Sequence, residues 1–119
     1  MKKRDAVAVL SALAQDNRLD VFRLLVEAGP VGMPAGHVAA SLKLPPSALS
    51  FHLDRLRDAS LVTVRRDGRS MIYAARFEAM DQLVSYLTDH CCEGRPELCR
   101  PKQRNAARPG GQKAATARA

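Results

Sequence analysis

All three cysteines of this 119-residue chain lie in one segment, HCCEGRPELC, which runs from His90 to Cys99. Cys91 and Cys92 are adjacent, and Cys99 follows seven residues after Cys92. Thiolate sulfurs select soft ions. Three thiolates in a pyramidal arrangement suit As(III) or Sb(III), which need no fourth ligand. The segment therefore predicts a metalloid site made of Cys91, Cys92 and Cys99.

Two other interpretations of the cysteines stay open. Zinc or cadmium prefers four ligands, and His90 would complete such a set. Cysteine is also often a small buried hydrophobe, so the thiols could be incidental to a constitutive DNA-binding protein. Adjacent side chains in an intact helix point about 100° apart, so convergence of Cys91 and Cys92 requires the helix to end near Gly94.

An enzymatic role for these thiols is not expected. A thiol-based reductase needs a cysteine whose pKa is lowered, as at a helix N-terminus. Here the pair is placed at the C-terminal end of a predicted helix, where the helix dipole disfavours a thiolate. The sequence contains no phosphate-binding loop or catalytic acid pair, so we predict that the protein is not an enzyme.

The charge distribution separates a nearly neutral body from a basic tail. Residues 1–99 hold 13 Lys and Arg against 12 Asp and Glu, whereas residues 100–119 hold 6 basic residues and no acidic one. The tail has no apolar periodicity, so we predict one folded domain over 1–99 and a disordered tail over 100–119. No apolar run is long enough to span a membrane. An odd number of cysteines without an export signal predicts a cytoplasmic protein.

The elements that position these residues are mainly helical. Leu49, Leu53 and Leu56 recur at helical spacing and predict one buried stripe. Alternating apolar residues on both sides of Asp67-Gly68 indicate a β-hairpin. The predicted order is a helix over 5–14, a second helix capped by Asp16 or Asn17 that ends before 28–34, short helices within 35–42 and 44–61, a hairpin within 61–75, and a last helix from about Phe77 through Cys91 to Gly94.

This order predicts a winged helix-turn-helix whose second short helix reads DNA. If the leucine stripe is buried, the opposite face of this helix carries the polar and aromatic residues given at the end of this paragraph. His52 lies on the flank of the leucine stripe. Helices that read a DNA groove use residues near their N-terminal end. An exposed phenylalanine is unfavourable unless a partner covers it, so Phe51 either contacts a thymine methyl or packs on a neighbouring helix. His52 is either a phosphate contact or a structural hydrogen-bonding group. The candidate DNA-binding residues are Ser47, Ser50, Phe51, His52, Arg55, and the hairpin arginines Arg65, Arg66 and Arg69.

The run S-x-H-L-x-x-L-x-x-A-x-L-V that begins at Ser50, together with the arginine-rich Asp-Gly hairpin, resembles the ArsR/SmtB family of metal-responsive bacterial repressors. The resemblance covers about Val7 to Cys99. It implies a homodimeric repressor of double-stranded operator DNA, with the first and last helices forming the dimer interface and no cofactor required for DNA binding. It matches Ser50 and His52 to the recognition helix and 65–69 to the wing.

The chain departs from the best-known arsenic sensors of that family. Those proteins carry a Cys-x-Cys pair leading into the helix-turn-helix, where this chain has GMPAGHVAASLKL without a thiol. The closing CCEGRPELC instead resembles a subgroup whose arsenite-binding cysteines lie at the end of the last helix. The resemblance thus implies that arsenite or antimonite binding at the C-terminal cysteines releases the repressor from its operator.

Overall fold

A computed structural model describes residues 1–98, which belong to two compact units, Met1–Leu87 and Thr88–Ala119. The predicted boundary after Cys99 lies outside the described residues and stays a prediction. The first unit contains α1 (Lys3–Leu13), α2 (Asp16–Ala28), β1 (Met33–Pro34), α3 (Ala35–Leu42), α4 (Pro46–Asp58), β2 (Val62–Asp67), β3 (Ser70–Ala75) and α5 (Phe77–Leu87). The described part of the second unit contains α6 (Cys91–Gly94) and a 3-10 turn (Pro96–Leu98). This order confirms the predicted winged helix-turn-helix.

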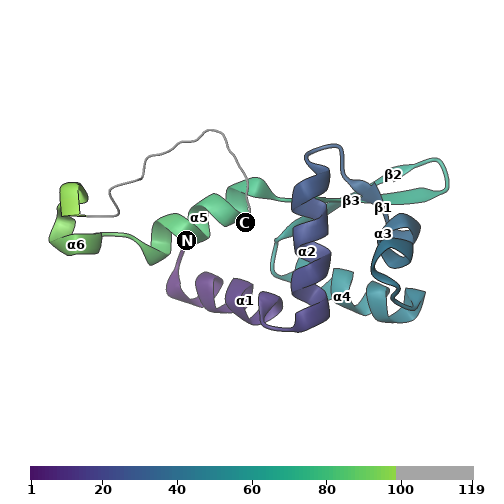
Figure 1. Cartoon of the computed structure of the whole chain (residues 1–119), viewed down its shortest axis with the longest axis horizontal. Helices are drawn as coiled ribbons and strands as arrows, with labels where there is room; N and C mark the ends of the chain where they lie inside the picture. The colour runs from purple at the N-terminus through teal and green to yellow at the C-terminus, as the bar shows by residue number, and fades with distance from the viewer. Residues whose placement is uncertain (99–119) are drawn as a thin grey trace. The chain divides into compact units, whose positions relative to one another are not determined.

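Helix α2 is the centre of the first unit and packs against α1, α3, α4 and β3 (Figure 1). Its Leu25 is fully buried, as are Leu56 of α4 and Leu61 just after α4. The predicted leucine stripe is confirmed, because Leu49 and Leu53 are also buried, at 2% and 1% exposure. Burying one face of α4 against α2 leaves the other face of α4 in solvent.

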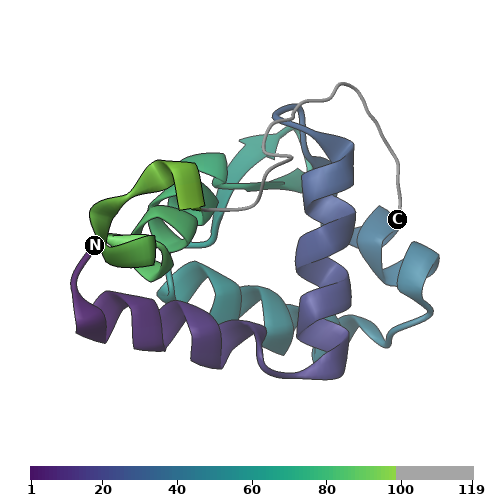
Figure 2. The same ribbon diagram turned by 60° about the vertical axis from the view of Figure 1, so that its left-hand side comes forward.

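Helix α1 lies beside α4, along the lower edge of the fold in Figure 2, and packs against α2, α4 and α5. It buries Ala6, Val9 and Ala12, whose spacing of three places them on one face. Small side chains at two of these positions let neighbouring helices approach closely. Val7 and Leu10 remain 55% and 44% exposed, so α1 has an apolar surface that the first unit does not cover.

The start of α2 differs from the prediction. The N-cap residue is Gln15, whose side-chain oxygen accepts a hydrogen bond from the Arg18 backbone N–H at 2.8 Å. Asp16 and Asn17 lie inside the helix as its first residues. The prediction of an Asp16 or Asn17 cap was therefore wrong by one residue. Gln15 provides the same acceptor oxygen on a longer side chain.

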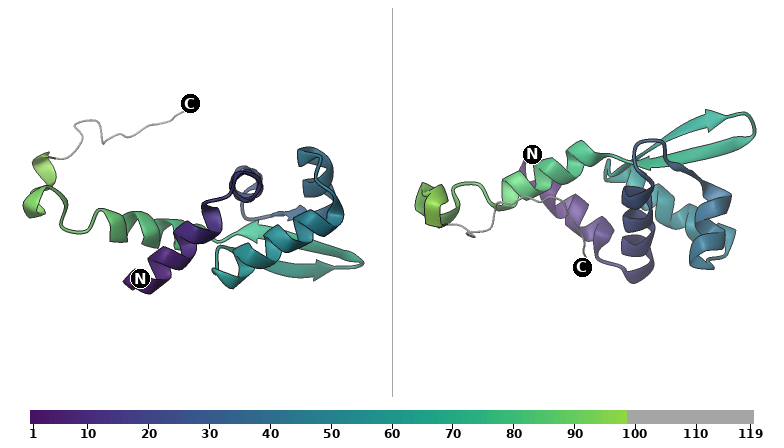
Figure 3. Two further views of the ribbon diagram at one scale, coloured as in Figure 1. Left: turned by 90° about the horizontal axis from the view of Figure 1, so that it is seen from below. Right: turned by 45° about the horizontal axis from the view of Figure 1, so that its top comes forward.

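Strands β2 and β3 form the predicted antiparallel hairpin, which extends away from the helices in both views of Figure 3. Asp67 pairs with Ser70 at the turn, and Gly68 has a φ of +63°. The sheet also contains a third strand that the sequence did not predict. β1 pairs with β3 through Met33–Tyr73 and Pro34–Ile72, and a two-residue strand is too short to show an alternating pattern.

Helix α5 is shorter than predicted. It ends at Leu87, so Cys91 does not continue its apolar stripe. The following residues His90, Cys92 and Glu93 all have positive φ angles, from 53° to 60°. The residues Thr88, Asp89 and His90 have weak helix propensity, which explains why the chain leaves the helix before Gly94.

Within 1–98, no helix is both long and apolar enough to cross a bilayer.

Candidate DNA-binding surface and cysteine segment

The exposed side of α4 carries Ser47, Ser50, Phe51 and Arg55, four of the eight residues predicted to contact DNA. Ser47, Ser50 and Arg55 are exposed. Ser47 and Arg55 belong to the face opposite the buried leucines, and Ser50 lies beside that face. Pro46 occupies the first turn of the helix and supplies a pre-set φ there. Two hydroxyls near the N-terminal end of a helix in the second position of a helix-turn-helix are placed to hydrogen-bond base edges or phosphates.

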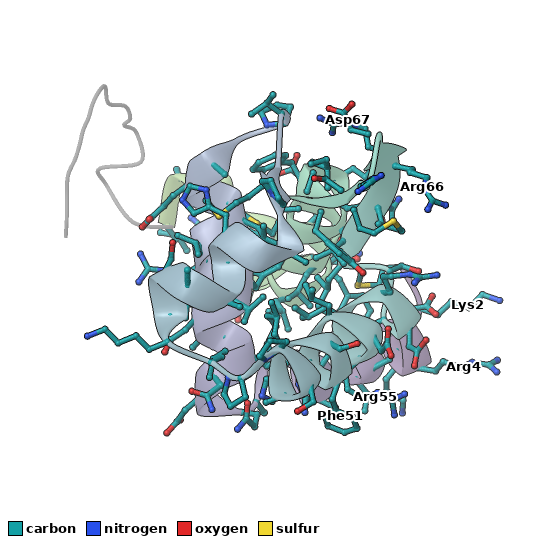
Figure 4. The ribbon with its side chains drawn as sticks, turned by 90° about the vertical axis from the view of Figure 1, so that its right-hand side faces the viewer. Lys2, Arg4, Phe51, Arg55, Arg66 and Asp67 are labelled. Carbon is teal, nitrogen blue, oxygen red and sulfur yellow. The ribbon has the colours of Figure 1, made fainter. Side chains whose placement is uncertain are left out.

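Phe51 is the aromatic centre of this face. Its side chain is 53% exposed and projects from α4 beside Arg55 (Figure 4). The guanidinium carbons of Arg18 and Arg55 lie 5.8 and 5.3 Å from the ring centroid, within the range of cation–π attraction. The ring contacts Arg18 of the neighbouring helix α2, so packing on a neighbouring helix is observed in part. Contact of the exposed part of the ring with a thymine methyl stays a prediction.

His52 does not belong to the exposed face. It is only 8% exposed, and its Nδ1 is buried without a hydrogen-bond partner among residues 1–98. Burial lowers the pKa of His52 below its usual value, and the nearby positive charge of Arg18 lowers that pKa further. Its burial leaves little of the ring on the exposed face of α4, and the assignment of His52 as a DNA contact stays a prediction. Its position three residues after Leu49 turns it toward the leucine stripe.

The three hairpin arginines have different surroundings. Arg65 donates a hydrogen bond from Nη2 to the Val31 carbonyl at 2.9 Å, which ties β2 to the loop before β1. Arg66 reaches the Gly68 carbonyl through Nε at 3.3 Å, and Arg69 is exposed at the turn. The structure thus separates Arg65, which braces the sheet, from Arg66 and Arg69 at the tip. Figure 4 shows Arg66 projecting outward at the hairpin.

The cysteine segment is only partly described. Cys91 is exposed and Cys92 is half-buried, whereas Cys99 lies outside the described residues. His90 is exposed and lies 3.6 Å from Asp89 between Nε2 and Oδ1. Among residues 1–98 no group of three His, Cys, Asp or Glu side chains is placed to hold a metal ion. Neither the three-cysteine set nor the four-ligand set with His90 is tested by this arrangement.

The backbone at this segment nevertheless removes one obstacle to convergence of the thiols. Cys92 has φ 53° and ψ 40°, and Glu93 has φ 58° and ψ 32°, so the chain is not α-helical there. The 100° separation of neighbouring side chains applies only inside a regular helix. The constraint that an unbroken last helix would have imposed on Cys91 and Cys92 therefore does not apply.

Arg18 is a functional candidate that the sequence did not reveal. It lies at the start of α2, well before the recognition helix, and no local motif marks it. Only the packing of α2 across α4 brings its guanidinium to Phe51.

Comparison with known proteins agrees with this geometry. A family model described as a helix-turn-helix domain matches residues 13–65. The chain is 32% identical over 87 residues to the HTH-type transcriptional regulator YgaV of Escherichia coli, covering 73% of this chain and 86% of that protein. It is 36% identical over 84 residues to the nodulation protein NolR of Rhizobium meliloti, covering 71% of this chain and 66% of that protein.

Solved structures give the same result. HlyU of Vibrio cholerae superposes with a TM-score of 0.58 at 33% identity, over 73% of this chain and 97% of that chain. An ArsR-like transcriptional regulator from Rhodococcus superposes with a TM-score of 0.67 at 24% identity, over 84% of this chain and 92% of that chain. This match shows a likeness of fold. YgaV and the Rhodococcus protein are named as transcriptional regulators, and none of these four proteins is named as an enzyme. By sequence and by fold, this chain belongs to the ArsR/SmtB family of winged helix-turn-helix transcriptional regulators.

Proposed function

We propose that the protein is a cytoplasmic homodimeric repressor that binds double-stranded operator DNA and releases it when As(III) or Sb(III) binds Cys91, Cys92 and Cys99. The observation that carries the DNA-binding part is the exposed face of α4, where Phe51 is 53% exposed between hydroxyl and guanidinium groups. The proposed contacts are Ser47, Ser50 and Phe51 in the major groove, Arg55 on the DNA backbone, and Arg66 and Arg69 on the backbone or minor groove.

Exposed apolar side chains on α1 and α5 support the homodimer. Leu10 of α1 is 44% exposed, and Leu87 of α5 is 58% exposed. The two helices pack against each other in the first unit, so their outer surfaces are available together to a second copy. A solved relative of the same fold from Mycobacterium bovis is described as homodimeric. Two copies would present two recognition helices to successive major grooves.

The metalloid part rests on the chemistry of the cysteines and on the backbone that carries them. Soft ions favour sites made only of thiolates, and the non-helical backbone at Cys92 and Glu93 leaves the thiols able to converge. Binding would fix the geometry of the chain that follows Leu87, the last residue of a proposed interface helix. A coupling of roughly 1–3 kcal/mol between the two sites would weaken DNA binding about 5–150-fold.

Arsenite titration against DNA-bound protein tests the proposal. The duplex is one that the protein itself selects from a random library, and release is followed by fluorescence anisotropy. We expect release by wild type and strongly reduced release by each single Cys→Ser variant. The variant C91S/C92S/C99S is the control, since it retains DNA binding and lacks every thiol. Release of that thiol-free variant by arsenite would refute the three-cysteine sensor.

The same assay separates the alternatives. In place of arsenite, Zn²⁺ or Cd²⁺ would release the protein if His90 completes a four-ligand site, and His90→Ala would abolish that response. A constitutive DNA-binding protein with incidental cysteines would respond to none of these ions. Mass spectrometry with and without arsenite reports the number of thiols used per ion.

A further inference from the structure

A shallow cavity of about 240 Å³ lies where α1, α2 and α4 meet. Three alanines line its apolar part. Its polar lining consists of Ser11, Arg18, Arg55 and Asp58, contributed by all three helices. The cavity therefore combines two guanidinium groups and a hydroxyl with one carboxylate, next to the exposed face of α4.

Arg18 lacks a full set of acceptors within the described chain. Its Nη1 makes one long hydrogen bond, 3.4 Å, to the Ala12 carbonyl. Its Nε is buried and has no partner among residues 1–98. Buried donors of a charged group are normally satisfied, and leaving one without an acceptor is costly. The buried Nε is closed to an acceptor from outside, but an acceptor in the cavity would reach the outer nitrogens of this guanidinium, whose bond to the Ala12 carbonyl is long.

The positive charge of Arg18 also affects its surroundings. It contributes to lowering the pKa of His52, after burial, which is the larger cause. The Phe51 ring, 5.8 Å from the guanidinium carbon, offers only a weak electrostatic partner. Arg55 differs, because its Nη2 donates to Asp58 Oδ2 at 2.9 Å. That pair is exposed on both sides, at 48% and 68%, and exposed pairs contribute little.

We propose that this cavity binds a backbone phosphate of the operator, with Arg18, Arg55 and Ser11 donating hydrogen bonds to the phosphate oxygens. Guanidinium groups present paired donors that match phosphate oxygens. Arg18 and Arg55 both contact Phe51, so a duplex that meets the exposed face of α4 brings its backbone near the cavity. Asp58 opposes binding by repulsion, and the phosphate displaces it from Arg55. The inference rests on the proposed binding of DNA and adds α1 and α2 to its contact surface.

The salt dependence of DNA affinity tests this assignment. The slope of log K against log salt is about −0.9 for each neutralised phosphate. Loss of one phosphate contact in each subunit of a dimer should therefore make the slope of Arg18→Gln less negative than that of wild type, by up to about 1.8. Arg55→Gln should act in the same direction. Arg18→Lys keeps the charge and should retain most of the slope while losing some affinity, because it loses the forked donor geometry.

The matched control is Arg23→Gln on the same helix. Arg23 is 71% exposed and lies 3.9 Å from Glu27, outside the cavity, so its slope should equal that of wild type. Thermal unfolding of each variant separates weaker phosphate binding from a failure to fold, and the exposed Arg55 provides the readout if Arg18→Gln unfolds. A wild-type slope in folded Arg18→Gln or in Arg55→Gln would overturn the proposal while leaving DNA binding itself intact.

A second arm distinguishes DNA phosphate from a small anion. The ring signals of His52 are followed by NMR while inorganic phosphate is added to DNA-free protein. Weak or no response to inorganic phosphate, together with a less negative salt slope in Arg18→Gln, supports a site for the DNA backbone. A saturable response to inorganic phosphate with an unchanged slope would assign the cavity to a free oxyanion and overturn the proposal.

Discussion

Replacement of Gly32 by alanine tests the strand that anchors the hairpin. Gly32 precedes β1 and has a φ of +76°. A Cβ atom added there would lie 2.5 Å from the Tyr73 carbonyl oxygen and 3.0 Å from Ile72 Cγ2. The first of these contacts is with backbone and is shorter than Cβ atoms tolerate. Because Tyr73 and Ile72 are the β3 partners of β1, the substitution must push the two strands apart.

The magnitude follows from two separate contributions. A left-handed backbone costs a non-glycine residue roughly 1–2 kcal/mol. Separation of β1 from β3 weakens its few ladder hydrogen bonds, each contributing about 1 kcal/mol. We therefore expect Gly32→Ala to lower the free energy of unfolding by about 2–4 kcal/mol, which is a large share of the stability of a small domain.

Two other glycines provide matched controls for the same change. Gly68 has a φ of +63° but nothing within 4 Å of its added Cβ, so Gly68→Ala should show only the backbone strain. Gly36 lies in α3 with nothing within 4 Å, so Gly36→Ala should stabilise the protein by about 0.5–1 kcal/mol.

Urea and thermal unfolding of the three variants measure these differences directly. The expected order of stability is Gly36→Ala above wild type, then Gly68→Ala, then Gly32→Ala. Gly32→Ala should also weaken DNA binding, because Val31 next to it accepts the hydrogen bond of Arg65. If Gly32→Ala proves no less stable than Gly68→Ala, the close approach of Gly32 to β3 is refuted.

Two further predictions concern His52 and the dimer. Because the folded-state pKa of His52 is lowered by burial and by Arg18, the unfolded state takes up its proton first, and stability should fall as pH drops below about 6.5. In urea unfolding as a function of pH, His52→Gln should reduce this acid loss. Equal curves for wild type and His52→Gln would contradict the burial argument. Leu87→Asp on α5 should convert the dimer to a monomer in sedimentation and lower DNA affinity. Leu98→Asp is the control, because Leu98 is 55% exposed and Leu87 is 58% exposed. Leu98→Asp should leave the dimer and the DNA affinity unchanged. A dimer of unchanged strength in Leu87→Asp would exclude α5 from the interface.

The parts of the fold that were predictable are those encoded within a few neighbouring residues. The leucines of α4 recur at a spacing that only a helix places on one face, and all of them are buried. Asp67-Gly68 marks the hairpin, because a tight turn needs residues that tolerate positive φ. Exposure of Phe51 also followed locally, since it lies opposite the buried stripe.

Predictions failed where distant residues competed with local preference. The apolar spacing predicts a stripe from Met80 to Cys91, yet α5 ends at Leu87. Apolar spacing alone does not reveal where packing stops supporting a helix. The strand β1 forms because β3 offers an open edge. The flank position of His52 left a phosphate contact and a structural role open, and the packing beside the leucines buries the side chain to 8% exposure.

The sequence by itself therefore determined the winged helix-turn-helix order, the exposed face of α4 and the grouping of all thiols in one segment, because each depends on periodicity or on residue type alone. Only the tertiary structure decided that Arg18 meets Phe51, that Arg65 braces the loop before β1, and that His52 is internal. These arrangements join residues from different elements. Their contacts arise from the packing of α2 across α4 and of β1 on β3, which no local pattern specifies.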